Sequence, residues 1–155
     1  MESNPADGAS WGMNNTPPRG TSLIELVVAL ALLSIVLLVA VPASAALRDR
    51  ASVRSASTEL AAALALARSV SVAEARVTAV RLDTASGTAV VLTPTDTLID
   101  LPLAARYGVG LSATRDSLAY GPTGRGYGAA NTTLTLRRGR ASDTIVISRL
   151  GRVRY

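Results

Sequence analysis

One acidic residue stands out because it adjoins a long apolar stretch. Glu25 follows Gly20 by five positions and precedes sixteen residues, Leu26–Val41, that are apolar apart from Ser34. A carboxylate inside such a stretch costs about 2.5–3.5 kcal/mol on membrane-insertion scales. A residue retained at that cost usually has a partner or a function, so Glu25 is the first candidate site residue.

A second candidate site is a group of arginines near the C-terminus. All 16 basic residues of the chain are Arg. Residues 137–155 contain six of them and a single acid, Asp143, so this segment has a charge of +5. The six are Arg137, Arg138, Arg140, Arg149, Arg152 and Arg154. The planar guanidinium binds phosphates and carboxylates well. An Arg-rich genome would produce the same composition without any binding role, so both interpretations stay open.

Missing residue types exclude several kinds of chemistry. The chain has no Cys and no His, which rules out disulfides, thiolate metal sites, a Cys nucleophile and a Ser-His-Asp triad. We therefore expect no enzyme activity, no metal site and no cofactor. Phe is absent and the single Trp is Trp11, so the core must consist mainly of Val, Leu, Ile and Ala.

The N-terminal part predicts a polar segment followed by an apolar helix. Residues 1–20 are rich in Asn, Gly and Pro and have no periodicity, so we expect them to be disordered. Residues 21–47 form a helix that can span most of a bilayer, which needs about 20 apolar residues. A signal-peptidase cut after Ala43-Ser44-Ala45 would instead release a soluble domain, but it would leave Glu25 unexplained.

The charges that flank this helix conflict with export of the C-terminal part. Arg48, Arg50 and Arg54 follow the span, whereas Arg19 alone precedes it. The positive-inside rule by itself would therefore place residues 48–155 in the cytoplasm.

Residues 48–155 predict one small α+β domain in which a helix packs on an antiparallel sheet. Pro42 predicts a kink or a local loss of helix. The pattern then resumes as an amphipathic helix over 48–75, whose one face carries Val53, Leu60, Leu64, Ala67 and Ser71. Arg54, Glu59 and Arg68 lie largely off that face.

Strand patterns follow the helix. Alternating residues predict strands at 77–82 and 88–93, joined by a turn at 84–87, with shorter strands at 98–103 and 109–114. The Gly-rich residues 120–130 predict a loop. A hairpin is predicted from strands 132–137 and 144–148 around a turn at 139–143, and a short strand follows Gly151.

The sequence around the apolar helix resembles the type IV pilins and type II secretion pseudopilins. The resemblance rests on RGTSLIEL, which contains Gly20, Glu25 and the start of the apolar helix, and on Pro42. It implies cleavage by a prepilin peptidase after Gly20, N-methylation of Thr21 and a filament whose core contains residues 21–47. The family usually starts its mature chain with Phe or Met rather than Thr.

The C-terminal Gly151-Arg-Val-Arg154 resembles the FimT and pseudopilin-H branch of that family. Some FimT-like minor pilins are DNA receptors for natural transformation. Because alternate residues of an extended chain share a face, Arg152 and Arg154 would point the same way. Together with the other arginines they would contact phosphates without sequence specificity and with strong salt dependence. An ordinary solvated basic surface is the alternative.

The resemblance implies a minor subunit of a type II secretion pseudopilus or a type IV pilus. It would be a single-pass inner-membrane protein with a leader (1–20) and a periplasmic domain, and its partners would be other pilin-like subunits, the prepilin peptidase and, in the DNA-receptor alternative, DNA. Glu25 would pair with the N-terminal ammonium of a neighbouring Thr21, because an ion pair offsets much of the cost of burial. Alternatively, Glu25 reaches the headgroups, or the chain never polymerises.

Overall fold

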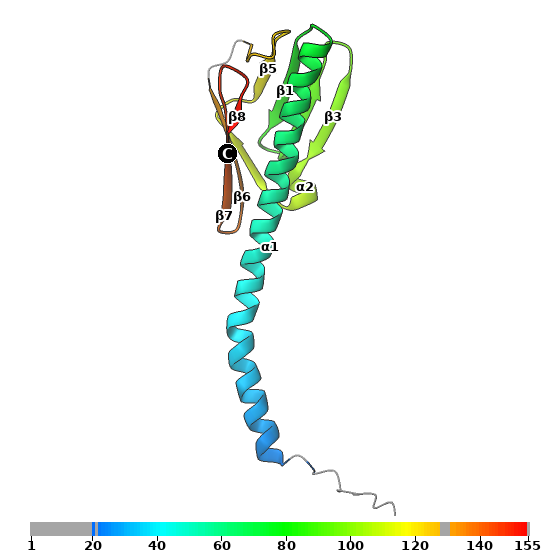
Figure 1. The fold of residues 1–155 in the computed structure, drawn as a ribbon. Coiled ribbons are helices and arrows are strands. Elements are labelled where there is room, and N and C mark those ends of the chain that lie inside the picture. Colours follow the sequence, from blue (N-terminus) through cyan, green and yellow to red (C-terminus); the bar gives the residue numbers. More distant parts are fainter. Residues whose placement is uncertain (1–19, 21, 128–130, 155) are drawn as a thin grey trace, which may run out of the picture. The chain divides into compact units, whose positions relative to one another are not determined.

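The computed structural model describes residues 20, 22–127 and 131–154. The chain divides into two compact units, one that ends at Leu38 and one that begins at Val39. The first helix, α1 (Leu23–Ala73), supplies residues to both (Figure 1). The later elements are β1 (Thr78–Asp83), β2 (Thr88–Leu92), β3 (Thr97–Pro102), α2 (Leu103–Tyr107), β4 (Gly110–Ala113), β5 (Ser117–Tyr120), β6 (Thr132–Arg138), β7 (Ala141–Ile147) and β8 (Val153–Arg154).

The first unit, as far as the structure describes it, is the N-terminal part of α1. The first turn of the helix contains a hydrogen bond from the amide of Leu26 to the carbonyl of Ser22 at 3.1 Å. Ser34 is the polar interruption of the apolar run, and its hydroxyl donates to the Leu30 carbonyl at 2.8 Å. A serine that bonds back to its own helix leaves no unsatisfied polar group in the apolar stretch.

In the second unit, α1 carries the predicted apolar stripe. Val53, Leu60, Leu64, Ala67 and Ser71 are all buried, as the spacing predicted. The helix also remains continuous at Pro42, so the predicted local loss of helix does not occur. Proline removes one backbone hydrogen bond, and the helix continues on both sides of it.

The end of α1 is a Schellman motif with an unusual residue. The amide of Arg76 donates to Ser71 and that of Ala75 to Val72, which are the two bonds of that motif. Ala75 has φ +50°, in the left-handed region, where glycine normally stands.

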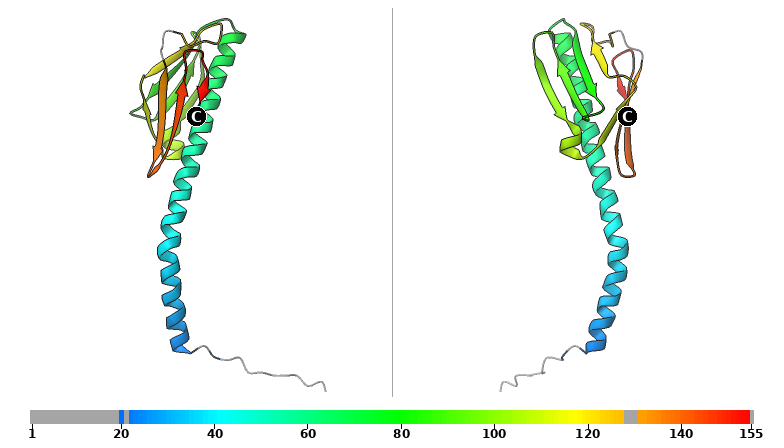
Figure 2. Two further views of the ribbon diagram at one scale, coloured as in Figure 1. Left: turned by 60° about the vertical axis from the view of Figure 1, so that its left-hand side comes forward. Right: turned by 180° about the vertical axis from the view of Figure 1, so that it is seen from behind.

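The strands form two antiparallel sheets of four, ordered β3-β2-β1-β5 and β4-β6-β7-β8. The two sheets lie beside the C-terminal part of α1 (Figure 2). Their inward side chains and the α1 stripe form one core, in which Leu, Val, Ile and Ala predominate. In β6, for example, Thr132, Leu134 and Leu136 are buried while the residues between them are partly exposed. This is the helix-on-antiparallel-sheet architecture that the sequence predicted.

Three local elements differ from the sequence-based expectations. Tyr120 belongs to a strand, β5, and pairs with Thr78. Leu103 is the first residue of α2 and not the last residue of a strand, because Pro102 ends β3 there and Gly108 caps the short helix in the left-handed region.

The predicted turn at 139–143 is also wrong. Arg138 pairs directly with Ala141, so the turn has only two residues. Gly139, at φ +54°, supplies the positive φ that a two-residue turn needs at its first position.

Candidate functional site

The N-terminal candidate residues lie at the start of α1. Gly20 is exposed, with no other group within 4 Å of where a Cβ would stand. Thr21 lies outside the described residues. Glu25 is exposed in the first turn of α1, where the positive end of the helix dipole favours a carboxylate. The cleavage and pairing roles of these residues stay predictions.

The apolar side chains that follow Gly20 are not covered by any other described part of the chain. The large apolar residues from position 23 to 38 are between 49% and 79% exposed: Leu23, Ile24, Leu26, Val27, Val28, Leu30, Leu32, Leu33, Ile35, Val36, Leu37 and Leu38. Within the described part of the chain, α1 is the one helix that is long and apolar enough to cross a membrane. Such a surface needs lipid or other apolar helices around it.

The six C-terminal arginines fall into separate places. Arg137 and Arg140 lie at the turn between β6 and β7, whereas Arg149, Arg152 and Arg154 lie at or beyond the other end of β7. The seven residues of β7 separate the two ends by about 20 Å. The structure therefore does not gather all six around one point. The expected alternation at the C-terminus does occur: Val153 packs against the core while Arg152 and Arg154 are exposed.

Arg138, the sixth arginine, is engaged inside the domain. Its Nε donates to Asp49 Oδ1 at 3.0 Å, and its Nη1 donates to Ser52 Oγ at 3.0 Å and to the Tyr107 carbonyl. These contacts join β6 to α1 and α2. Arg138 is consequently a structural residue of the domain.

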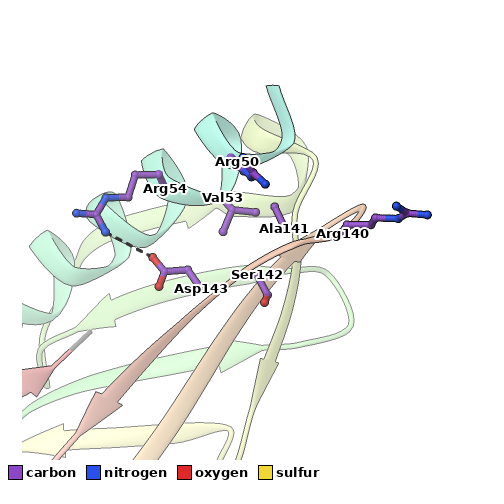
Figure 3. Close-up of a pocket in the computed structure, with 7 residues that line it drawn as sticks. All are labelled: Arg50, Val53, Arg54, Arg140, Ala141, Ser142 and Asp143. Atoms are coloured by element: carbon purple, nitrogen blue, oxygen red, sulfur yellow. Dashed lines mark ion pairs between the residues drawn. The ribbon is translucent and has the colours of Figure 1, made fainter. Parts of the chain in front are cut away.

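Asp143 is also bound by α1. The hydroxyl of Ser57 donates to Asp143 Oδ2 at 2.5 Å, and Arg54 Nη1 lies 4.0 Å from the same oxygen. Figure 3 shows this pair beside a cavity of about 440 Å³, lined by residues of α1 and of the β6–β7 hairpin. The one acid of the basic C-terminal segment thus fixes the hairpin to the helix.

Glu59 binds α2. It accepts a hydrogen bond from the Tyr107 hydroxyl at 2.6 Å and pairs with Arg106. The carboxylate raises the pKa of Arg106 by charge attraction, and the hydrogen bond to Glu59 raises the pKa of Tyr107.

The sequence contains a pattern that could have identified these contacts. Asp49, Ser52 and Glu59 recur at helical spacing directly beside the apolar stripe. A half-buried polar row in that position is expected to bind neighbouring elements through hydrogen bonds.

Two connected loops, residues 121–127 and 148–152, lie at the end of the domain opposite the β6–β7 turn. The amide of Gly126 donates to the Arg149 carbonyl at 3.0 Å, and Arg68 Nε donates to the Gly124 carbonyl at 2.9 Å. Tyr120 is fully buried beneath them, and among the described residues its hydroxyl has no hydrogen-bond partner. Burial raises the pKa of Tyr120 to about 12.

Models of known protein families match most of the chain. Residues 56–151 match the model of the type II transport protein GspH, and residues 18–41 match the prokaryotic N-terminal methylation motif. The chain belongs to the GspH family. The methylation-motif match contains Gly20 and Glu25, whereas Arg152 and Arg154 lie beyond the GspH match.

Solved structures show the same fold. The type IV minor pilin FimU of Pseudomonas aeruginosa matches with TM-score 0.58 and 19% identity, over 68% of this chain and 88% of that one. A second crystal form of FimU gives TM-score 0.55 and 18% identity, over 65% and 90%. No curated protein is a significant match. This GspH-family chain is therefore pilin-like in fold, and its membership implies processing by a prepilin peptidase and assembly with other pilin-like subunits.

Proposed function

We propose that the chain is a minor subunit of a type II secretion pseudopilus. A prepilin peptidase would cut it between Gly20 and Thr21 and methylate Thr21. The processed chain would remain anchored in the inner membrane with its domain in the periplasm. It would then be assembled into the fibre through α1. The observation that carries this proposal is the methylation motif at 18–41, which coincides with an apolar helix that no other part of the described chain covers.

Glu25 would direct that assembly. In an apolar environment its carboxylate would pair with the ammonium of a neighbouring subunit's Thr21, and a subunit packed in the wrong register would leave both charges unpaired. Its position in the first turn of α1 supports this role, because it places the carboxylate four residues from the predicted new N-terminus at Thr21.

Replacement of Gly20 tests the processing step. Gly20→Ala should block the peptidase and leave a protein about 20 residues longer on a denaturing gel. Gly8→Ala, within the predicted leader, should be processed normally. If Gly20→Ala is processed as well as wild type, the assignment of the cleavage site is wrong.

A type IV minor pilin that binds DNA is a second candidate. It is favoured by Arg149, Arg152 and Arg154, which are exposed and form no ion pair with any described residue. Such a basic surface binds phosphates with a strong salt dependence.

A salt series with the domain alone tests this candidate. All buried apolar core residues lie between Val53 and Ile147, so a chain that starts at Arg48 keeps the whole core. Micromolar binding that weakens steeply with salt and is lost in Arg152→Ala/Arg154→Ala would favour the DNA receptor. Absence of binding at low salt, or binding unchanged in that double variant, would exclude the C-terminal arginines as the DNA site.

A further inference from the structure

Five exposed arginines lie on α1 just after its apolar stretch ends and at the turn between β6 and β7. The last large apolar residue of that stretch is Leu47, which is 63% exposed. Arg48, Arg50 and Arg54 follow it on α1. The turn between β6 and β7 adds the side chains of Arg137 and Arg140, and we refer to these five residues as the arginine collar.

The two acids nearest the collar are already engaged within the domain. Asp49 accepts from Arg138 at 3.0 Å, and Asp143 accepts from Ser57 at 2.5 Å and pairs with Arg54. Arg48, Arg50, Arg137 and Arg140 form no ion pair with any described residue. The collar therefore has positive charge that the domain itself does not neutralise.

Two hollows adjoin the collar, and each is lined by residues of α1 and of the β6–β7 hairpin. Arg50 and Arg140 line both of them. The hollow in Figure 3 is the more polar one and contains Arg54, Ser142 and Asp143. The other has a volume of about 510 Å³ and is walled by small apolar residues, Pro42, Ala45, Ala46 and Ala141, and it is also lined by Asp49, whose carboxylate accepts from Arg138. The second hollow thus combines two guanidiniums and an apolar wall with one carboxylate that Arg138 already binds.

We infer that the arginine collar binds the phosphate of an anionic phospholipid headgroup. The inference rests on the proposed membrane anchor, because the end of the apolar stretch then lies at the depth of the headgroups. Arg50 and Arg140 would hold the phosphate, and the wall of Pro42, Ala45 and Ala46 would contact the upper part of an acyl chain. Clustered Arg next to a transmembrane helix attracts anionic lipids. A free phosphate has no apolar part that could contact the apolar wall.

Lipid binding would explain why Arg48, Arg50 and Arg54 follow the apolar stretch. A charge count alone places them on the cytoplasmic side. Arginines that bind headgroups of the leaflet beside the domain stabilise the anchored subunit on whichever side the domain lies.

Lipid selectivity of the full chain tests the inference. The chain is reconstituted in phosphatidylcholine vesicles, insertion is checked by resistance to alkaline carbonate, and electron paramagnetic resonance compares spin-labelled phosphatidylglycerol with spin-labelled phosphatidylcholine. We expect a preference for phosphatidylglycerol that falls in Arg50→Ala/Arg140→Ala by about fivefold per arginine removed. Arg50→Lys/Arg140→Lys should keep most of the preference, since it retains the charge.

A matched control removes the same charge from the other end of β7. Arg149→Ala/Arg152→Ala should keep the preference of the wild type, and millimolar inorganic phosphate should not abolish it. Equal affinity for both lipids in the wild type, equal loss in the two alanine pairs, or displacement of the lipid by inorganic phosphate would overturn the inference. A chain that inserts but shows no preference leaves the proposed function intact, whereas a chain that does not insert overturns both.

Discussion

The part of α1 before Arg48 and the part from Val53 onward are both regular helix, yet their side chains suit different surroundings. Before Arg48 the large apolar side chains are exposed all round the helix. From Val53 to Ser71 the buried residues form one stripe, with exposed residues such as Ser55 and Ala62 on the opposite face. A helix that is apolar all round requires lipid or other apolar helices, whereas a striped helix folds against its own domain. The difference shows that a single helix can combine an assembly segment with a domain element.

The largest expected effect compares one leucine from each part. Leu64 is fully buried, so Leu64→Ala should lower the free energy of unfolding of the domain by about 2–5 kcal/mol. Leu33 is 52% exposed, and Leu33→Ala should change it by less than about 0.5 kcal/mol. Urea unfolding of the full chain in detergent, followed by near-ultraviolet circular dichroism of the tyrosines, measures both. Equal losses would contradict the distinction between the two parts.

The next effect belongs to the domain alone and depends on pH. The pKa of Tyr120 rises from 10 in the unfolded chain to about 12 on folding, because burial disfavours the phenolate. The neutral form therefore stabilises the folded state fully below pH 10, and that contribution is lost as the pH rises from 10 to 12. The loss should reach about 2–3 kcal/mol.

Tyr120→Phe supplies the control for this pH dependence. The variant should be about as stable as wild type at neutral pH, because the hydroxyl has no partner among the described residues. It should also lose less stability between pH 10 and 12 in urea titrations of the domain that begins at Arg48. Identical alkaline profiles for the variant and the wild type would show that Tyr120 does not titrate in this way.

A smaller effect separates two adjacent arginines. Arg138→Ala removes the bonds to Asp49, Ser52 and Tyr107 and should cost about 1–2 kcal/mol of domain stability, since these side chains are partly exposed. Arg137 is exposed and forms no ion pair with a described residue, so Arg137→Ala should be neutral within about 0.5 kcal/mol. The opposite order in urea unfolding would mean that Arg138 is a surface residue in solution.

The smallest expected effect is a stabilisation at the end of α1. Ala75→Gly should raise the stability of the domain by about 0.5–1 kcal/mol, because glycine adopts the left-handed backbone of Ala75 without strain. Ala62 is exposed in the interior of the helix, and Ala62→Gly should lower the stability by about 1 kcal/mol. Thermal unfolding of the two variants should show midpoints displaced in opposite directions. A destabilised Ala75→Gly would contradict the assigned cap.

Sequence patterns predicted the parts of the fold that depend on local periodicity. The stripe from Val53 to Ser71 and the paired strands β6 and β7 follow directly from apolar spacing. The two-residue turn at Gly139 was harder to predict, because Ala141, Ser142 and Asp143 have poor strand propensity and are held in β7 by pairing with β6. Strand β5 is four residues long and is likewise defined by its partner.

The sequence could indicate only those candidate site residues whose predicted role depends on linear spacing. Gly20 and Glu25 stand in the methylation-motif match at a fixed distance that the sequence displays. The grouping of the arginines depends on strand register, which placed Arg138 against Asp49 and separated Arg140 from Arg149. Register is set by tertiary packing, and the charge of a segment does not reveal it.

Mass spectrometry of the N-terminal peptide, from the protein purified out of the membranes of its own host, tests the central claim most directly. The account predicts a peptide that begins at Thr21 and carries one methyl group on its amine. A chain that begins at Ala46, as a signal-peptidase cut after Ala45 would leave it, or a chain that still carries residues 1–20 would contradict the account.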